Sequence, residues 1–330
     1  MEDVVARLEA LEQRSAAMER QLHAWRRVAG ACLSLVLLLL ALGLVPLRPA
    51  GAAATLDQRV AALESKLYYV TRVGQAMYFT GVNVHLRNGA NRTDAANGLG
   101  NLIVGYNELR PNNPDGSNPN VRTGSHNVIV GYQHNYGSFG GLVVGNKCQI
   151  LAPYASVTGG LNNTARGLYA HVSGGRSNTA SGEASCVSGG YVNIASAFVS
   201  SVSGGNNNKA TGDAASVSGG GSNLASNRYA SVTGGSDNAA SGEAASVSGG
   251  GSNVASNRYA SVTGGSNNTA SGEAASVSGG TQSGAAGPRA SVSGGWRNSA
   301  DGDASAVSGG SSRSVGGADD WRAGGYFQDF

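Results

Sequence analysis

Valine, alanine and glycine return with a 15-residue period in the C-terminal half of the chain. Glycine pairs run from Gly159-Gly160 to Gly309-Gly310 at this spacing, so residues 151–315 form 11 units of the pattern x-G-x-x-A-S-V-S-G-G-x-x-N-x-A. Positions in the unit are numbered as places 1 to 15, with residue 151 at place 1. A fixed period of this length is typical of a solenoid, in which each unit forms one turn of a stack.

The order of residues within each unit predicts two short strands. In A-S-V-S, alternation puts Ala at place 5 and Val at place 7 on one face and the two serines on the other. Val holds place 7 in every unit, and place 15 is Ala from Ala165 to Ala300, with Val315 at the end. These columns predict an all-β fold, a parallel β-solenoid of 15-residue rungs. The glycine pair allows the positive φ of a tight corner, and Asn at place 13 predicts a ladder of side-chain amides.

Charged side chains support the same register. Place 3 carries, in successive units, Asp213, Arg228, Glu243, Arg258 and Glu273. Adjacent rungs lie about 4.8 Å apart, so this order sets opposite charges side by side. We therefore expect Arg228 beside Glu243 and Arg258 beside Glu273.

The predicted core is thin. Burial of one Val contributes about 1.5–3 kcal/mol, whereas ordering each residue costs about 1–2 kcal/mol. One Val and two Ala in each rung do not offset the ordering of a whole rung. Hydrogen bonds between rungs and contacts between chains are expected to supply the remainder.

Less regular segments flank the array. The motifs LIVG, VIVG and LVVG, which end at Gly105, Gly131 and Gly145, look like degenerate rungs, and PNNPDGSNP at 111–119 predicts a loop insertion. Together with alternating residues after Gln75 they predict an irregular β region. That region spans 75–150.

Residues 316–330 are expected to form a C-terminal cap. Gly324-Gly325 keep the phase of the array, while Trp321, Tyr326 and Phe327 replace small residues. Terminal units of a repeat array commonly differ from the others in this way.

The N-terminal part of the chain, up to residue 74, follows a heptad pattern instead. Apolar residues alternate spacings of four and three in two segments, which predicts short coiled coils at 1–27 and 48–74. The two seams consist of Val4, Leu8, Leu11, Met18, Leu22 and Trp25, with Ser15 as a polar member, and of Leu56, Val60, Leu63, Leu67 and Val70. Isolated helices this short are marginal in water, so other contacts must bring the chains together.

Residues 28–47 are uncharged and long enough to cross a bilayer as a helix. Arg26 and Arg27 precede this run, so the positive-inside rule predicts a single-pass protein with a cytoplasmic N-terminus and a repeat domain in the periplasm or outside the cell. The competing interpretation is a cleaved signal sequence, because small residues at 52–54 offer a cleavage site. The length of the apolar run favours the uncleaved anchor.

Composition narrows the function classes. The 330 residues contain 52 Gly but only 5 Phe and 3 Trp, which leaves little material for the core of a conventional enzyme. The formal net charge of +3 is spread along the chain without a basic cluster, so a nucleic-acid partner is not expected. We expect no enzymatic activity and no cofactor.

Candidate catalytic and metal-binding residues lack suitable partners. His126 and His134 have no acidic or Cys neighbour at ligand spacing and are expected at the surface or in turns. Cys148 and Cys186 would lie more than two rungs apart, beyond the reach of a disulfide, and are expected to be free. The repeated acids are interpreted as a solvated charge ladder: Glu183, Asp213, Glu243, Glu273 and Asp303.

Four tyrosines share place 4 and are expected to face outward: Tyr154, Tyr169, Tyr229 and Tyr259. Their structural role would be to shield a corner of the roll. Their functional role would be a surface contact, stacking on sugars or matrix polymers.

The pattern ASVSGGxxNTASG resembles the head repeats of trimeric autotransporter adhesins, the YadA-like heads. The resemblance covers residues 101 to about 325 and implies a left-handed parallel β-roll, a homotrimer, coiled-coil stalks and cell adhesion. The final segment GGADDWRAGGYFQDF departs from that family, because it lacks the alternating strands of a C-terminal membrane barrel. The N-terminal span is expected to replace that anchor.

Two functions follow as expectations. The first is a non-enzymatic, membrane-tethered, adhesin-like surface protein that contacts an extracellular polymer or a host or matrix surface. The second is a secreted polysaccharide- or ice-binding solenoid, released by signal cleavage, because flat Ser and Thr columns can order a ligand or water.

Overall fold

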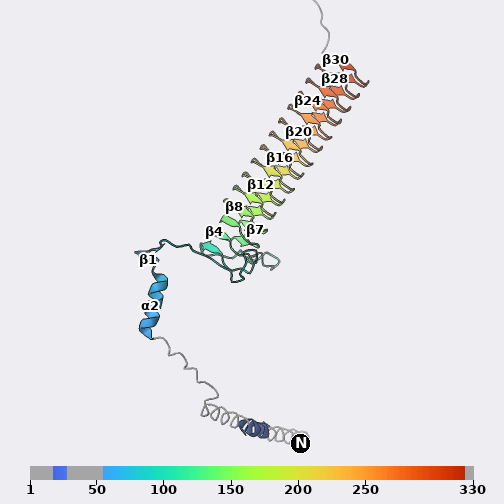
Figure 1. Ribbon diagram of the computed structural model, residues 1–330. Coiled ribbons are helices and arrows are strands. Elements are labelled where there is room, and N and C mark those ends of the chain that lie inside the picture. Colours follow the sequence, from blue (N-terminus) through green and yellow to red (C-terminus); the bar gives the residue numbers. More distant parts are fainter. Residues whose placement is uncertain (1–17, 28–54, 324–330) are drawn as a thin grey trace, which may run out of the picture. The chain divides into compact units, whose positions relative to one another are not determined.

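The computed structural model describes residues 18–27 and 55–323, which belong to two separate units, residues 1–84 and 85–330 (Figure 1). The predicted membrane segment at 28–47 and most of the predicted coiled coil at 1–27 lie outside the described residues. Among the residues that are described, no helix is both long and apolar enough to cross a bilayer.

The first unit contains an exposed amphipathic helix. Helix α2 (Leu56–Leu67) begins with a capping box in which the Thr55 hydroxyl accepts a hydrogen bond from the Gln58 N–H. Four residues of the predicted seam form a solvent-exposed stripe on it: Leu56, Val60, Leu63 and Leu67. None of the residues of α2 is buried.

The helix ends earlier than the heptad pattern predicts. Val70, the last residue of the predicted seam, opens strand β1 (Val70–Val73), which pairs antiparallel with β2 (Ala76–Phe79). Gly74, with φ of 59°, lies in the turn between them. The β-branched and aromatic residues that follow Leu67 favour a strand over a further helical turn.

The second unit is a parallel β-solenoid built from two sheets, whose strands stack along one axis (Figure 1). The first, the Ser-Val sheet, has 15 strands, mostly formed by places 6 and 7: β3 (Leu102–Val104), β4 (Val128–Tyr132), β6 (Leu142–Asn146), β8 (Ser156–Val157), β10 (His171–Val172), β12 (Cys186–Val187), β14 (Ser201–Val202), β16 (Ser216–Val217), β18 (Ser231–Val232), β20 (Ser246–Val247), β22 (Ser261–Val262), β24 (Ser276–Val277), β26 (Ser291–Val292), β28 (Ala306–Val307) and β30 (Trp321–Arg322).

The second, the Ala sheet, has 13 strands formed by places 14 and 15 and the equivalent earlier residues: β5 (Asn135–Tyr136), β7 (Gln149–Ile150), β9 (Thr164–Ala165), β11 (Thr179–Ala180), β13 (Ile194–Ala195), β15 (Lys209–Ala210), β17 (Leu224–Ala225), β19 (Ala239–Ala240), β21 (Val254–Ala255), β23 (Thr269–Ala270), β25 (Gly284–Ala285), β27 (Ser299–Ala300) and β29 (Ser314–Val315). Each strand of the regular array pairs with its neighbours in a 15-residue register, as predicted.

The inner and outer faces also follow the prediction. The place-7 valines, such as Val247, and the place-15 alanines, such as Ala240, are at most 1% exposed, whereas Ser246 is only partly buried. Gly105, Gly131 and Gly145 lie in or next to β3, β4 and β6, which confirms the three degenerate rungs. The segment at 111–119 is a loop between β3 and β4.

Each rung turns at three residues with positive φ. The second glycine of the pair is one of them: Gly235 has φ of 84°, and a methyl group there would overlap the carbonyl oxygen of Gly250. The first glycine, Gly234, has neither a positive φ nor a neighbour within 4 Å of an added Cβ. Only half of the glycine pair is therefore required by the corner. The other two turns, at places 4 and 12, use residues other than glycine.

The place-13 asparagines form a buried column, but they do not bond one another through their amides. Asn238 Nδ2 donates to the carbonyl oxygens of Gly234 and of Gly250 in the next rung, at 2.9 and 3.0 Å. The Asn238 side-chain oxygen accepts from the backbone N–H of Asn253 at 3.0 Å. Each asparagine therefore satisfies backbone groups of two rungs, and the predicted amide-to-amide ladder is wrong for this column.

Charged residues occupy the last described position of three inner columns. Arg322 follows Val307 in the valine column, Asp320 follows Ser305 at place 5, and Arg313 follows the final Asn. Charges at core positions discourage another strand from adding to an open edge.

Candidate functional site: the place-4 corner

The place-4 corner is the turn at places 2 to 4 that joins a strand of the Ala sheet to the next strand of the Ser-Val sheet. Residues at place 4 have φ between 52° and 59°, from Tyr154 to Asp319. The backbone N–H of each turns back to the preceding rung, as when Tyr229 donates to the Asp213 carbonyl at 2.9 Å. The four tyrosines at this place are between 44% and 56% exposed, which confirms that they face outward.

Tyr154 and Tyr169 lie in adjacent rungs and stack on each other. Their ring centroids are 5.3 Å apart with an interplanar angle of 9°, and Phe139 meets Tyr154 edge-on at 5.4 Å. Such pairs add about 0.5–1.5 kcal/mol beyond their buried area. This end of the corner therefore has a structural explanation in shielding the first rungs.

Tyr229 and Tyr259 lie two rungs apart, with Ala244 between them, and each stacks on its own neighbouring arginine. The guanidinium carbon of Arg228 lies 4.5 Å from the Tyr229 ring centroid, and that of Arg258 lies 4.6 Å from the Tyr259 centroid. Each arginine also donates from Nη2 to the tyrosine hydroxyl at 3.0 Å. The two Arg-Tyr pairs have the same geometry.

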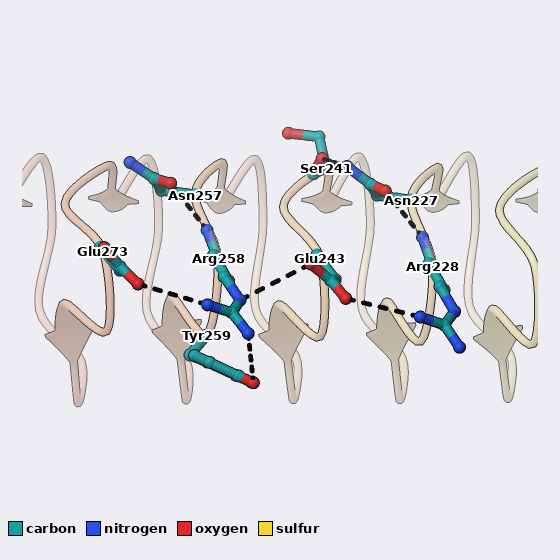
Figure 2. Close-up of polar contacts among 8 residues, drawn as sticks. All are labelled: Asn227, Arg228, Ser241, Glu243, Asn257, Arg258, Tyr259 and Glu273. Carbon is teal, nitrogen blue, oxygen red and sulfur yellow. Dashed lines mark hydrogen bonds and ion pairs between the residues drawn. The ribbon is translucent and has the colours of Figure 1, made fainter.

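The charge register is confirmed (Figure 2). Arg228 lies 3.9 Å from Glu243, and Arg258 lies 3.6 Å from Glu243 and 3.8 Å from Glu273. These separations exceed hydrogen-bond lengths, and the side chains are 41–58% exposed. Exposed pairs of this kind contribute about 0–1 kcal/mol each, so they follow from the register of the rungs and add little to the stability of the fold.

Asparagine at place 2 orders the backbone beneath each arginine. The Asn227 side-chain oxygen accepts from the Arg228 N–H at 2.8 Å, while its amide donates to the Ser241 carbonyl of the next rung at 3.1 Å (Figure 2). Asn257 repeats both contacts, with Arg258 and Ser271. This role was not predicted from the sequence; the signal was the repeated triplet Asn-Arg-Tyr.

These contacts repeat every two rungs. The two copies of this larger repeat form a surface of four rungs, the comb, made of residues 227–229, 242–244, 257–259 and 272–274. Its bulky teeth, Asn-Arg-Tyr, alternate with small notches, Gly-Glu-Ala. A depression lies between the last notch and the next rung, lined by Glu273, Ala274, Pro288 and Arg289. The alternation therefore concerns both the size and the charge of the exposed side chains.

The remaining acidic residues of the predicted charge ladder are Glu183, Asp213 and Asp303. Asp303 accepts two hydrogen bonds from Arg289, at 2.7 and 3.2 Å. Glu183 and Asp213 occupy the same corner in earlier rungs. Within residues 18–27 and 55–323, no group of three or more His, Cys, Asp or Glu side chains is arranged to hold a metal ion.

His134 is buried, contrary to the expectation of a surface or turn residue. It is 2% exposed and occupies the position that Asn holds in later rungs, because the early rungs are one residue shorter and shift the phase. Its Nδ1 accepts from the Cys148 N–H at 3.2 Å and its Nε2 donates to the Val130 carbonyl at 3.0 Å. Burial lowers the pKa of His134. His126, in contrast, lies in a turn with φ of 56°.

Both described cysteines are free, as expected. Cys148 is the next member of the inner column after His134, and burial raises the pKa of its thiol. Cys186 lies on the outer face of the Ser-Val sheet.

The outer face of the Ser-Val sheet contains a serine-histidine contact that was not predicted from the sequence. Ser156 Oγ lies 2.7 Å from His171 Nδ1, and His171 Nε2 lies 2.9 Å from Ser173 Oγ. Cys186 follows His171 in the same column. The second ring nitrogen faces a serine and not a carboxylate, so the arrangement lacks the orienting acid of a hydrolytic triad. The 15-residue spacing was the signal that could have revealed it.

No protein-family model matches the chain, and no curated protein sequence is significantly similar to it.

Proposed function

We propose that this chain is a structural, adhesin-like surface protein, tethered to a membrane through residues 28–47 and presenting its solenoid outside the cytoplasm as a homotrimer. The observation that carries the proposal is repetition of exposed groups. A long stack displays outward side chains of the same kind at multiples of 15 residues, such as the tyrosines at the place-4 corner and the Ser or Thr at place 8 of every unit. Repeated weak contacts on a rigid scaffold suit multivalent attachment to an extended polymer or another surface.

Two exposed apolar features support association of chains. The stripe on α2 is solvent-exposed, with Leu56 at 72% and Leu63 at 57%. The outer face of the first strands of the Ser-Val sheet is also apolar, where Leu102 and Val104 are 47% and 54% exposed. Apolar patches of this kind commonly mark protein interfaces. Three chains, and the left-handed roll, follow from the resemblance of the repeats to trimeric adhesin heads.

The decisive experiment combines topology and mass. In intact cells that produce the full chain, external protease should remove the repeat domain, while the recovered membrane-bound protein should retain Met1 in its intact mass. Loss of the N-terminal segment would show cleavage and release. Protection of the repeats in cells whose outer envelope has been opened would place them in the cytoplasm and contradict the proposal.

Trimer formation is tested separately. Sedimentation equilibrium of residues 55–330 is expected to give three times the chain mass, and a stable folded monomer would contradict it.

A secreted binding module is the second candidate. The outer face of the Ser-Val sheet carries Ser or Thr at place 8 of every unit, and Thr158 Oγ1 donates to the Ser173 carbonyl at 2.9 Å, which fixes its orientation. A regular hydroxyl face of this kind suits an ordered polysaccharide or ice surface. Depression of the freezing point by the purified chain, or its retention on an insoluble polysaccharide together with an N-terminus after residue 50, would favour this candidate.

A further inference from the structure

The comb is complementary to itself when it is displaced by one rung. Its teeth carry a positive charge and a ring, at Arg228-Tyr229 and Arg258-Tyr259. Its notches carry a negative charge and a methyl group, at Glu243-Ala244 and Glu273-Ala274. Teeth recur every two rungs, or about 9.6 Å. A surface of the same pitch but opposite phase would therefore meet it tooth to notch and charge to charge.

We propose that the comb binds the comb of a second copy of this chain, with the two solenoids antiparallel. A two-fold axis midway between the Glu243 and Arg258 rungs sets Arg228 opposite Glu273 of the second copy, and Arg258 opposite Glu243 of the second copy. The symmetry generates both contacts again, so four ion pairs form. Such an interface closes after two combs have met, whereas a parallel copy shifted by one rung would leave both ends open to further copies.

The charges of the comb are available for this contact. Glu243 is 41% exposed and Glu273 58% exposed, and each lies 3.6–3.9 Å from its arginines, too far for a hydrogen bond. By contrast, the neighbouring Arg289 and Asp303 form a hydrogen-bonded pair at 2.7 Å within one chain. The carboxylates of the comb thus retain acceptor capacity that a second chain can use.

The same pattern disfavours other occupants. An anionic polymer that was attracted by Arg228 and Arg258 would be repelled by the intervening Glu243. One face of Tyr229 is covered by its own arginine at 4.5 Å, which reduces the ring area open to a sugar. A second comb has neither conflict, because its charges alternate with the same period.

A single comb contact should be weak. The rungs from Arg228 to Glu273 span about 14 Å, so the contact is smaller than the roughly 1,000 Å² of a stable interface. Many copies on one surface would compensate through effective concentration. The inference holds whether the chain is anchored or secreted, and whether or not three chains assemble through other surfaces.

Charge exchange tests the proposal. The acidic variant combines Arg228→Glu with Arg258→Glu, and the basic variant combines Glu243→Arg with Glu273→Arg. The full chain, kept in mild detergent at low salt, is studied by sedimentation velocity over a concentration series. The wild type is expected to form multiples of its basic assembly as concentration rises: pairs where that assembly carries one comb, and larger multiples where a homotrimer carries three. Each variant alone should associate at least about tenfold more weakly, since attraction becomes repulsion.

Mixing the two variants supplies the decisive result. An equimolar mixture should associate again, which also shows that both variants are folded. A control with the same charge change on another corner, Arg176→Glu with Arg297→Glu, should behave as the wild type does. Absence of concentration-dependent association in the wild type, equal association of all variants, or failure of the mixture to associate would each overturn the proposal.

A polysaccharide occupant has a distinct signature. Retention of the wild type on insoluble β-1,4-glucan that is lost with Tyr229→Ala and Tyr259→Ala, but unchanged by charge exchange, would assign the comb to a sugar polymer and overturn self-recognition.

Discussion

The side-chain oxygen of Asn223 accepts a hydrogen bond from the backbone N–H of Asn238, one rung further along the stack, at 3.0 Å. The Asn223 amide donates to the Gly219 carbonyl of its own rung and to the Gly235 carbonyl of the next. One buried side chain thus makes three hydrogen bonds to backbone groups of two rungs, in addition to the bond that the Gly235 carbonyl accepts from the Gly221 N–H. The column substitutes for the larger apolar core that the rungs lack.

The column is interrupted at Ser283, and repairing it should stabilise the solenoid. Ser283→Asn supplies an amide for the Gly279 and Gly295 carbonyls, which the serine hydroxyl does not reach. Each regained hydrogen bond contributes about 0.5–1.5 kcal/mol, so we expect a gain of about 1–3 kcal/mol in the free energy of unfolding, measured by denaturant titration. The reciprocal variant Asn268→Ser should lose a similar amount. A neutral effect of both changes would remove the structural role assigned to the column.

A charge in the valine column should open the stack locally. Val247 is 1% exposed, so Val247→Asp buries a carboxylate without a partner, at a cost of several kcal/mol. Because solenoids are stabilised between nearest neighbours, hydrogen exchange should accelerate in the rungs around Val247 and remain slow in distant rungs. Ser246→Asp, on the outer face, is the matched control and should leave exchange nearly unchanged. Equal loss of protection in both variants would contradict the assignment of Val247 to the inner face and Ser246 to the outer face.

Val199 should be a strained residue. It has φ of 54°, which β-branched residues strongly disfavour, and its side chain is 46% exposed. Val199→Asn should therefore stabilise the fold by about 1 kcal/mol, since Asn tolerates the left-handed region. Val254→Asn, at an outward position in strand β21 with ordinary backbone, is the control and should give no gain. Thermal unfolding of the two variants distinguishes relief of strain from a general effect of asparagine.

The first rungs should weaken in acid. Burial lowers the pKa of His134, and its Nδ1 accepts from the Cys148 N–H, so the folded state favours the neutral ring. The unfolded chain then binds more protons below the ordinary pKa of about 6.5, and stability falls as pH decreases through that value. Amide protection near His134 should drop between about pH 7 and pH 5. His134→Asn, the residue of later rungs, should abolish this dependence; an unchanged profile would exclude His134 as its source.

The period made most of the solenoid predictable from the sequence. Spacing alone sets which residues share a column, so the buried Val247, the outward Tyr229 and the contact of Arg228 with Glu243 all followed from it. The segments in which the period changes were harder to predict. The shorter early rungs move His134 and Cys148 into the inner column, and nothing in either residue type announces that shift.

Two of the three turns in each rung could not be predicted from residue preferences. Places 4 and 12 adopt positive φ even where Val192 or Val199 stands, because closure of the rung and hydrogen bonds to the preceding rung outweigh the intrinsic preference of a single residue. The asparagine column was predicted, but its partners were not, because a period reveals neighbours of the same kind and not the backbone groups between them. At the candidate site, the spacing predicted the ion pairs, whereas the stacking of arginine on tyrosine depends on side-chain conformation.

The two-rung period of the comb constrains how a gene encoding this chain can change in length. Residues 211–240 and 241–270 are nearly the same sequence, so unequal recombination between their coding segments adds or removes two rungs at once. Such an event leaves every place-3 arginine between two acidic residues and every tooth beside a notch. Insertion of one 15-residue unit would keep the backbone stack intact but bring like charges together at the junction. A gain of two rungs at a time therefore lengthens the solenoid while the alternating charges of the comb stay in phase.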